Sequence, residues 1–184
     1  MLTTLQRVKY YLNIDFADTS QDFILQELIA QASDAIETYC NRNFRRKIYT
    51  ESVQGAETLW VKNTPIHDVL ELIDDDGIDI DCRHTENKVM IRKPKTVSLT
   101  GGVRLNEPAY LGYTISYDGG YDVIPASLAK VATEMVIISY EEIQNETMSI
   151  KNRSEGSVSQ SYIDKAVIHD KHKAILDEYK IIHI

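Results

Sequence analysis

The feature that most constrains the fold is a change in the spacing of apolar residues along the chain. Up to residue 40, apolar side chains recur every three or four positions, which is the spacing of one helix face. From residue 45 to residue 118 the pattern changes to short runs typical of strands, some of which alternate apolar and polar residues. The helical spacing returns after residue 124. This order predicts helices on both sides of an inserted β region.

The helical parts of the sequence predict separate segments with recognisable ends. Thr3 and Gln6 have the spacing of a capping box at the start of the first segment. The second segment is predicted over about Gln21–Cys40, and the third over Ala126–Gln144, just after a proline suited to a helix start. Asp164 is expected to cap a short last helix. The third helix is apolar on most sides, which indicates either the centre of a bundle or a helix covered by a neighbouring subunit.

The middle of the chain predicts a small antiparallel sheet made of hairpins. The expected strands are Ile48–Val53, Leu59–Val61, Val69–Ile73, Ile78–Cys82, Lys88–Arg92, Val97–Leu99 and Leu111–Tyr117. Asp76-Gly77 is a strong hairpin turn signal between two of them. The predicted class is therefore mainly α with a β insertion (α+β). It is a bundle of about four helices, with the sheet inserted between the second and third long helices.

These boundaries also define the expected domain organisation. The 184 residues are expected to form a single domain. Residues 1–44 and 119–184 would form its helical core, and residues 45–118 its inserted β region. Residues 145–162 are polar and rich in Ser, Asn and Gly, so they are expected to form a mobile loop.

Charge and cysteine content argue against several classes of protein. The net charge of −8 argues against duplex binding, which needs clustered Lys and Arg. Cys40 and Cys82 lack the spacing of a metal or redox motif, and Cys40 is interpreted as a packing residue. Neither a signal peptide nor a membrane-spanning run is visible, so a soluble intracellular protein without membrane contact is expected.

One basic cluster follows the second helix. It consists of Arg42, Arg45, Arg46 and Lys47. We interpret these side chains as charges that favour the C-terminal end of the helix dipole, with contact to an anion or a nucleic acid as the alternative.

Catalytic and cofactor motifs are not visible in the sequence. Glycine-rich nucleotide loops and the GxSxG elbow are missing, so we expect no enzyme activity, no catalytic residues and no cofactor. His169 and His172 could share one helix face, but HxxH alone is a weak metal signal and we interpret both as surface histidines.

An acidic cluster around the predicted hairpin turn is the other candidate metal site. It consists of Asp74, Asp75, Asp76, Asp79 and Asp81. We interpret it as a charged hairpin tip, in which Ile78 and Ile80 face inward and the turn aspartates stay in water. A calcium site is the alternative, although the EF-hand spacing is not met.

Surplus apolar residues near the C-terminus predict an interface with another protein. The tail of residues 181–184 is unusually apolar, and exposed apolar surface usually has a partner. The candidate interface residues are Tyr162, Ile168, Ile175, Tyr179 and Ile182.

Three segments of the chain carry a resemblance to a known family. They are LWVKNTPIHDV at residues 59–69, YTISYDGGY followed by IPASL at residues 113–128, and a Ser/Gly-rich stretch at residues 153–162 before the ending ILDEYK. Together with the two N-terminal helices, this order resembles the head-tail connector (adaptor or head-completion) family of long-tailed bacteriophages and prophages. The Tyr-Asp-Gly-Gly-Tyr junction with the Ile-Pro helix start is its most specific part.

The resemblance implies a structural virion assembly protein with no catalytic site. It would form a homo-oligomeric ring under the portal, dodecameric in the assembled virion, that extends the DNA channel and joins head to tail. Its other partners would be the portal protein and the next neck or tail-completion protein. DNA would pass through the channel without specific binding, which suits an acidic chain.

The implied location is the head-tail junction of the virion, after assembly in the cytoplasm of a bacterial host. The alternatives are another phage neck or tail-completion protein, or a small dimeric binding module without catalytic activity.

Overall fold

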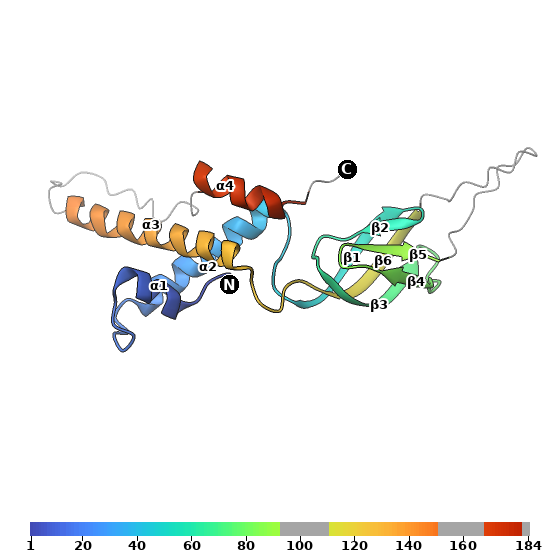
Figure 1. The fold of residues 1–184 in the computed structure, drawn as a ribbon, viewed down its shortest axis with the longest axis horizontal. Helices are drawn as coiled ribbons and strands as arrows, with labels where there is room; N and C mark the ends of the chain where they lie inside the picture. The colour runs from blue at the N-terminus through green and yellow to red at the C-terminus, as the bar shows by residue number, and fades with distance from the viewer. Residues whose placement is uncertain (93–110, 151–167, 182–184) are drawn as a thin grey trace, which may run out of the picture. The chain divides into compact units, whose positions relative to one another are not determined.

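The computed structural model describes residues 1–92, 111–150 and 168–181 (Figure 1). The elements in chain order are α1 (Leu5–Leu12), α2 (Asp22–Cys40), β1 (Lys47–Gly55), β2 (Thr58–Trp60), β3 (Ile66–Asp74), β4 (Cys82–His84), β5 (Lys88–Ile91), β6 (Leu111–Gly119), α3 (Ala126–Ile150), α4 (Asp170–Leu176) and the 3-10 turn η1 (Asp177–Tyr179). The mixed α and β composition expected from the sequence is confirmed. The described strands form two small antiparallel sheets, whereas one sheet was expected.

The chain divides into two compact units. The helical unit comprises Met1–Arg42 and Ile124–Ile184, and the β unit comprises Asn43–Val123. The sequence predicted the corresponding boundaries at residues 44/45 and 118/119. The expectation that the whole chain forms a single domain stays a prediction.

The helical unit is organised around α3, which packs against α1, α2 and α4. Its N-terminal half supplies the buried residues Leu128, Val131, Ala132, Met135 and Val136. The apolar residues that recur every three or four positions along α2 are buried opposite it, and α2 ends at Asn41 in the left-handed conformation. The central-helix interpretation therefore accounts for the first half of α3.

The start of α1 differs from the prediction. The cap of α1 is Thr4, whose hydroxyl accepts a hydrogen bond from the Arg7 amide at 3.3 Å. Thr3 is buried instead, with its hydroxyl 2.7 Å from that of Thr133 on α3, so tertiary packing takes the residue that was expected to cap.

Helix α3 is also longer than predicted. It runs to Ile150, so residues 145–150 of the expected mobile loop are helical, and the remainder of that loop lies outside the described residues. Asp164, the expected cap of the last helix, lies outside them as well, and α4 begins at Asp170. Within the described residues, no helix is both long and apolar enough to span a membrane.

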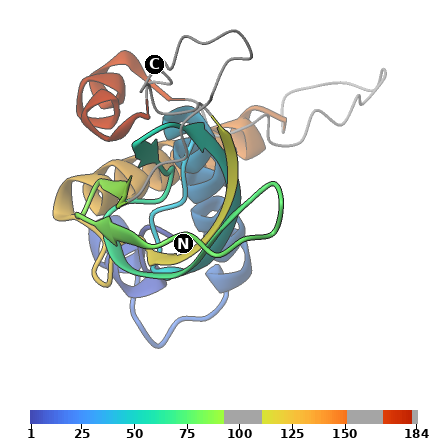
Figure 2. The same cartoon turned by 90° about the vertical axis from the view of Figure 1, so that its right-hand side faces the viewer.

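The β unit has its own core. One sheet has the strand order β1-β6-β3 and the other β2-β5-β4, with all pairs antiparallel. The alternation predicted for β6 is confirmed, since Tyr113, Ile115 and Tyr117 are buried. These side chains share one apolar cluster with Leu59 and Val89 of the second sheet. Viewed end-on, the strands of both sheets curve around this interior (Figure 2).

The predicted hairpin turn is present, but the strand expected after it is not. Gly77 adopts a φ of 77° and donates its amide to the Asp74 carbonyl at 2.9 Å. The run Ile78–Cys82 contributes one isolated bridge, between Ile73 and Asp79, and β4 starts only at Cys82. The predicted inward orientation is wrong for Ile78, which is exposed, but it is confirmed for Ile80, which is half-buried against the core of the β unit. The predicted strand Val97–Leu99 lies outside the described residues.

Candidate assembly surfaces

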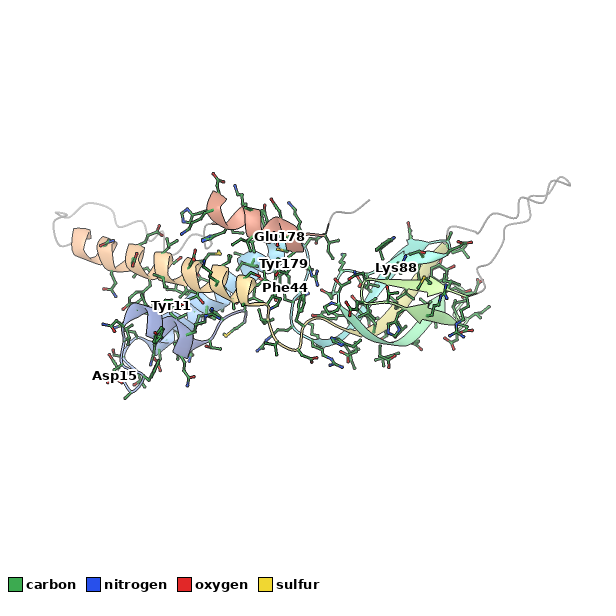
Figure 3. The ribbon with its side chains drawn as sticks, in the orientation of Figure 1. Tyr11, Asp15, Phe44, Lys88, Glu178 and Tyr179 are labelled. Atoms are coloured by element: carbon green, nitrogen blue, oxygen red, sulfur yellow. The ribbon has the colours of Figure 1, made fainter. Side chains whose placement is uncertain are left out.

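The predicted C-terminal interface residues are only partly available on the surface. Ile168, Ile175 and Tyr179 are each half-buried, and Tyr162 and Ile182 lie outside the described residues. The Tyr179 hydroxyl, labelled in Figure 3, lies 2.7 Å from the hydroxyl of Ser127 on α3. Part of the apolar surplus in this segment is therefore used within the chain.

The segment of α4 and η1 is attached to α2 by polar contacts. Tyr39 donates its hydroxyl to Asp177 at 2.7 Å, and the Ile181 amide donates to the Cys40 carbonyl at 3.1 Å. The Cys40 thiol lies 3.6 Å from the Leu176 carbonyl, and burial raises the pKa of this thiol to about 11. A protonated, buried thiol is a poor nucleophile, and its packing role is the one predicted.

The interpretation of His172 as a surface histidine is wrong. Its side chain is 1% exposed, and Nε2 lies 3.2 Å from a carboxylate oxygen of Glu134 on α3. Burial lowers the pKa of His172, against the opposing effect of Glu134. His169 is partly exposed, with its ring centroid 5.8 Å from that of His172. The buried histidine thus helps to fix α4 on α3.

The acidic cluster at the β3 turn contains one structural carboxylate. Asp74 is buried, and its Oδ1 accepts hydrogen bonds from the amides of Asp76 at 3.0 Å and Ile78 at 2.9 Å. The expectation that all turn aspartates stay in water is therefore wrong for Asp74, because this carboxylate closes the turn. The other four aspartates of the cluster are exposed. Across the described ranges, no three His, Cys, Asp or Glu side chains gather as metal ligands would.

Arg46 of the basic cluster after α2 pairs with carboxylates of the β unit. Arg46 binds Asp118 at 2.5 Å and Asp122 at 2.9 Å. The guanidinium hydrogen bonds hold the pKa of Asp118 below its usual range. The helix-dipole interpretation is thus wrong for Arg46. No basic residue lies in the last turn of α2, and the Arg46 charge is neutralised by carboxylates at and after the end of β6.

The Arg46 pairs lie at the point where the chain enters and leaves the β unit. Arg45 forms a parallel bridge with Tyr121, and the Tyr121 ring stacks on Phe44 with centroids 6.4 Å apart. The two connecting segments of this unit therefore run side by side. We call this pair of segments, residues 43–46 and 119–123, the connecting ribbon.

The Tyr-Asp-Gly-Gly-Tyr motif has a structural explanation in this ribbon. A Cβ on Gly119 would lie 2.3 Å from the Asn63 carbonyl oxygen, and Gly120 has a φ of 99°. The Tyr117 hydroxyl donates to the Glu51 carboxylate and accepts the Asn63 amide at 3.0 Å. The motif thus joins β6 to the loop before β3.

Sequence reasoning missed the largest group of exposed aromatic residues in the part of the chain that the structure describes. It lies where α1 turns into α2, in residues 10–27, which we call the α1–α2 corner. The exposed apolar side chains there are Tyr10, Tyr11, Phe16, Phe23 and Ile24. Figure 3 labels Tyr11 and Asp15 in this corner. Phe23 and Ile24 precede Leu25 and do not belong to the buried apolar face of α2 that begins there. Apolar residues outside the buried face of a helix are the sequence signal that could have revealed this group.

Comparison with solved structures shows that this fold is found in the necks of phage-like particles. A chain from the neck of an empty gene transfer agent (GTA) particle, computed with C6 symmetry, gives a TM-score of 0.58 at 14% identity. The match covers 100% of this chain and 91% of the neck chain. The neck of the native particle, computed with C12 symmetry, gives 0.53 at 13% identity, again over 100% and 91%. The virion of the native gene transfer agent gives 0.56 at 13% identity with the same coverage.

The sequence itself identifies the family. The sequence model of the head completion protein family matches residues 1–182, and the chain belongs to this family. No curated protein matches the chain in sequence. The resemblance to head-tail connectors seen in the sequence motifs is thereby confirmed.

Proposed function

We propose that the protein is a structural subunit of the neck that joins head to tail in a phage-like virion. The observation that carries this proposal is the family match over residues 1–182. The likeness of the fold to gene transfer agent necks supports the same location. A structural role also suits the use of titratable side chains in the described residues, since His172 and Glu134 fix a helix and Asp74 closes a turn.

Within this role, we propose that copies of the chain form a ring beneath the portal. The C6 and C12 symmetry of the similar neck structures supports a ring of identical subunits. Such a ring would extend the DNA channel and offer a surface to the next neck or tail-completion protein. The net charge of −8 supports free passage of DNA, because an acidic wall offers few cations to phosphates.

The partly exposed C-terminal residues remain candidates for contacts in this assembly. Ile168, Ile175 and Tyr179 each keep some surface in water, which supports a secondary contribution to an interface. Tyr162 and Ile182 are proposed on the sequence argument alone.

The test of this function is the size and shape of the assembled species. Sedimentation velocity over a wide concentration range, with and without purified portal protein, should reveal a ring-sized species. Negative-stain images of that species should show a central hole. If neither condition gives a species larger than a dimer, the ring proposal is wrong and a dimeric binding module becomes the better explanation.

A further inference from the structure

The α1–α2 corner is held in one conformation by a buried lysine. The side chain of Lys9 is 3% exposed, and its Nζ lies 2.5 Å from a carboxylate oxygen of Asp22. The same ammonium group donates to the carbonyls of Asp18 at 2.6 Å and Phe16 at 3.4 Å. Burying a charge is costly unless it is paired in this way. The Phe16 side chain nevertheless remains exposed to solvent, although its backbone carbonyl is bound by Lys9.

Exposed aromatic residues on a fixed backbone are typical of binding surfaces. The Phe23 side chain is 75% exposed although it stands at the start of a well-packed helix. The rings of Tyr10 and Tyr11 lie edge to face, with their centroids 5.6 Å apart. A surface that is already ordered loses little conformational entropy when a partner covers it. Large aromatic side chains are also the residues that most often dominate binding energy.

The charge of this corner restricts what can cover it. Residues 10–27 contain Asp15, Asp18, Asp22 and Glu27 but neither Lys nor Arg. Asp22 is neutralised by Lys9, whereas hydrogen bonds from Ser20 hold the pKa of Asp18 below its usual value. The corner is therefore aromatic and anionic, and its partner should be apolar and cationic.

The outer face of the sheet β2-β5-β4 has the complementary character. Strand register pairs Trp60 with Lys88, and pairs Met90 with both Thr58 and Arg83. Because side chains alternate along a strand, these five residues point away from the side that buries Leu59, Val89 and Ile91. This sheet face, which we define by those five residues, carries two cations and no carboxylate.

An exposed tryptophan and its neighbouring lysine stand at the edge of this sheet face. Trp60 is 66% exposed, and the Lys88 ammonium lies 5.8 Å from the centroid of its ring. Figure 3 labels Lys88 on this sheet. A flat aromatic ring beside a cation can pack on Phe16 or Phe23 and leave the cation facing Asp15 or Asp18.

We infer that the α1–α2 corner of one copy docks on the sheet face of a second copy. The inference rests on the proposed ring, because a ring is closed by head-to-tail contacts between two different surfaces of the same chain. DNA is the weaker candidate for the sheet face. Two cations fall well short of the roughly 6–10 phosphate contacts of typical DNA-binding proteins.

Charge reversal on the two surfaces tests this contact. The corner variant is Asp15→Lys with Asp18→Lys, and the sheet variant is Arg83→Glu with Lys88→Glu. Each should raise the concentration needed for half-assembly by at least about tenfold, because like charges would face each other across the contact. The chain that carries all four substitutions restores opposite charges and should regain rings. Sedimentation velocity measures the ring fraction in each case.

Controls separate this contact from folding and from the proposed function. Asp34→Lys changes the charge of an exposed α2 residue outside the corner and should assemble like the wild type. Circular dichroism should match in all variants. The corner variant should unfold at a somewhat lower temperature, because it loses the carboxylates that accept the Ala17 and Ser20 amides, each at 2.9 Å, and a cooperative transition above the assay temperature confirms that its fold is kept.

The possible outcomes distinguish the two proposals. A wild-type protein that forms no ring, even with portal protein, contradicts the proposed function and the inference together. Rings that persist in both charge-reversed variants overturn the inference alone. So does a corner variant that forms rings but no longer binds portal protein, since that result assigns the corner to the portal. If the wild type binds duplex DNA and the sheet variant does not, the inference is likewise overturned, because the sheet face would then bind DNA and not a second copy.

Discussion

At the scale of single residues, Gly120 is required by its backbone conformation and by its neighbours. Its φ of 99° lies in a region that other residues rarely adopt, and a Cβ would lie 2.5 Å from the Arg45 carbonyl oxygen. Gly77 also has a positive φ of 77°, but nothing lies within 4 Å of a Cβ built there. A side chain at Gly77 would therefore cause backbone strain alone, whereas one at Gly120 would cause both strain and a steric clash.

This difference predicts unequal effects of alanine. Gly120→Ala should lower the free energy of unfolding by about 3 kcal/mol, because strain and a backbone clash both apply. Gly77→Ala should cost about 1 kcal/mol, from strain alone. Chemical denaturation of the full chain measures both values. Equal losses for the two variants would contradict the steric role of the Arg45 segment.

At the scale of elements, a buried histidine holds α4 on α3, and we expect its protonation to affect the stability of this contact. His172 contacts Glu134 on α3, and the charges near this pair are those of Lys130, Lys171 and His169. Burial lowers the pKa of His172 below its usual 6.5 in the folded protein. The unfolded chain therefore binds this proton more tightly than the folded chain does.

The sign of the pH effect follows from that difference. The stability linked to neutral His172 is fully present above pH 6.5 and is lost as the pH falls from 6.5 to the lower pKa of the folded state. The midpoint of thermal unfolding should fall over this range in the wild type. It should fall less in His172→Gln. His169→Gln should keep most of the wild-type fall, because burial is the main cause of the lowered pKa of His172 and His169 is a minor one. An unchanged pH profile in His172→Gln would exclude His172 as the source.

Elements with a regular apolar period could be predicted from the sequence, and those that depend on polar pairing could not. The stripe of α2, the alternation of β6 and the Asp76-Gly77 turn follow from local spacing and turn chemistry. Burial of His172 and Lys9 depends on partners distant in sequence or within a loop, which spacing does not reveal. The environment of polar residues is therefore the feature that the sequence predicts least well.

The same limit explains the missed surface and the missing strand. The run Ile78–Cys82 has β-type composition, but its pairing with β3 is limited to one bridge and the backbone hydrogen bonds of Ile78 and Ile80, so it forms no continuous strand. Strand pairing is decided by tertiary contacts, to which composition contributes only weakly. Exposed aromatic residues of the α1–α2 corner likewise become visible only once the buried face of α2 is known.

At the scale of the whole molecule, the β unit has the features of an independently folding part. Its core draws on both of its sheets, and every described residue of this apolar cluster, from Tyr49 to Tyr117, belongs to the β unit itself. Its two ends are held together by the connecting ribbon, in which Arg46 binds Asp118 and Asp122. A closed core with paired ends does not need the rest of the chain to define its edges.

The isolated fragment 43–123 should therefore fold on its own. We expect a dispersed NMR amide spectrum and a cooperative unfolding transition. Arg46→Ala should lower its unfolding midpoint more than Arg83→Ala does, because Arg46 joins the two ends and Arg83 lies on an open sheet face. A collapsed spectrum with no transition would show that the helices are needed to complete this unit.

The connecting ribbon also has a consequence for how such chains can diversify. Because the β unit leaves the chain at nearly the point where it enters, it can be lengthened, shortened or exchanged without requiring the helices to be rebuilt. The junction between Arg42 and Ile124 is therefore a position at which another domain should be insertable. An engineered particle could carry a foreign domain there, once per subunit, provided that its own termini lie side by side.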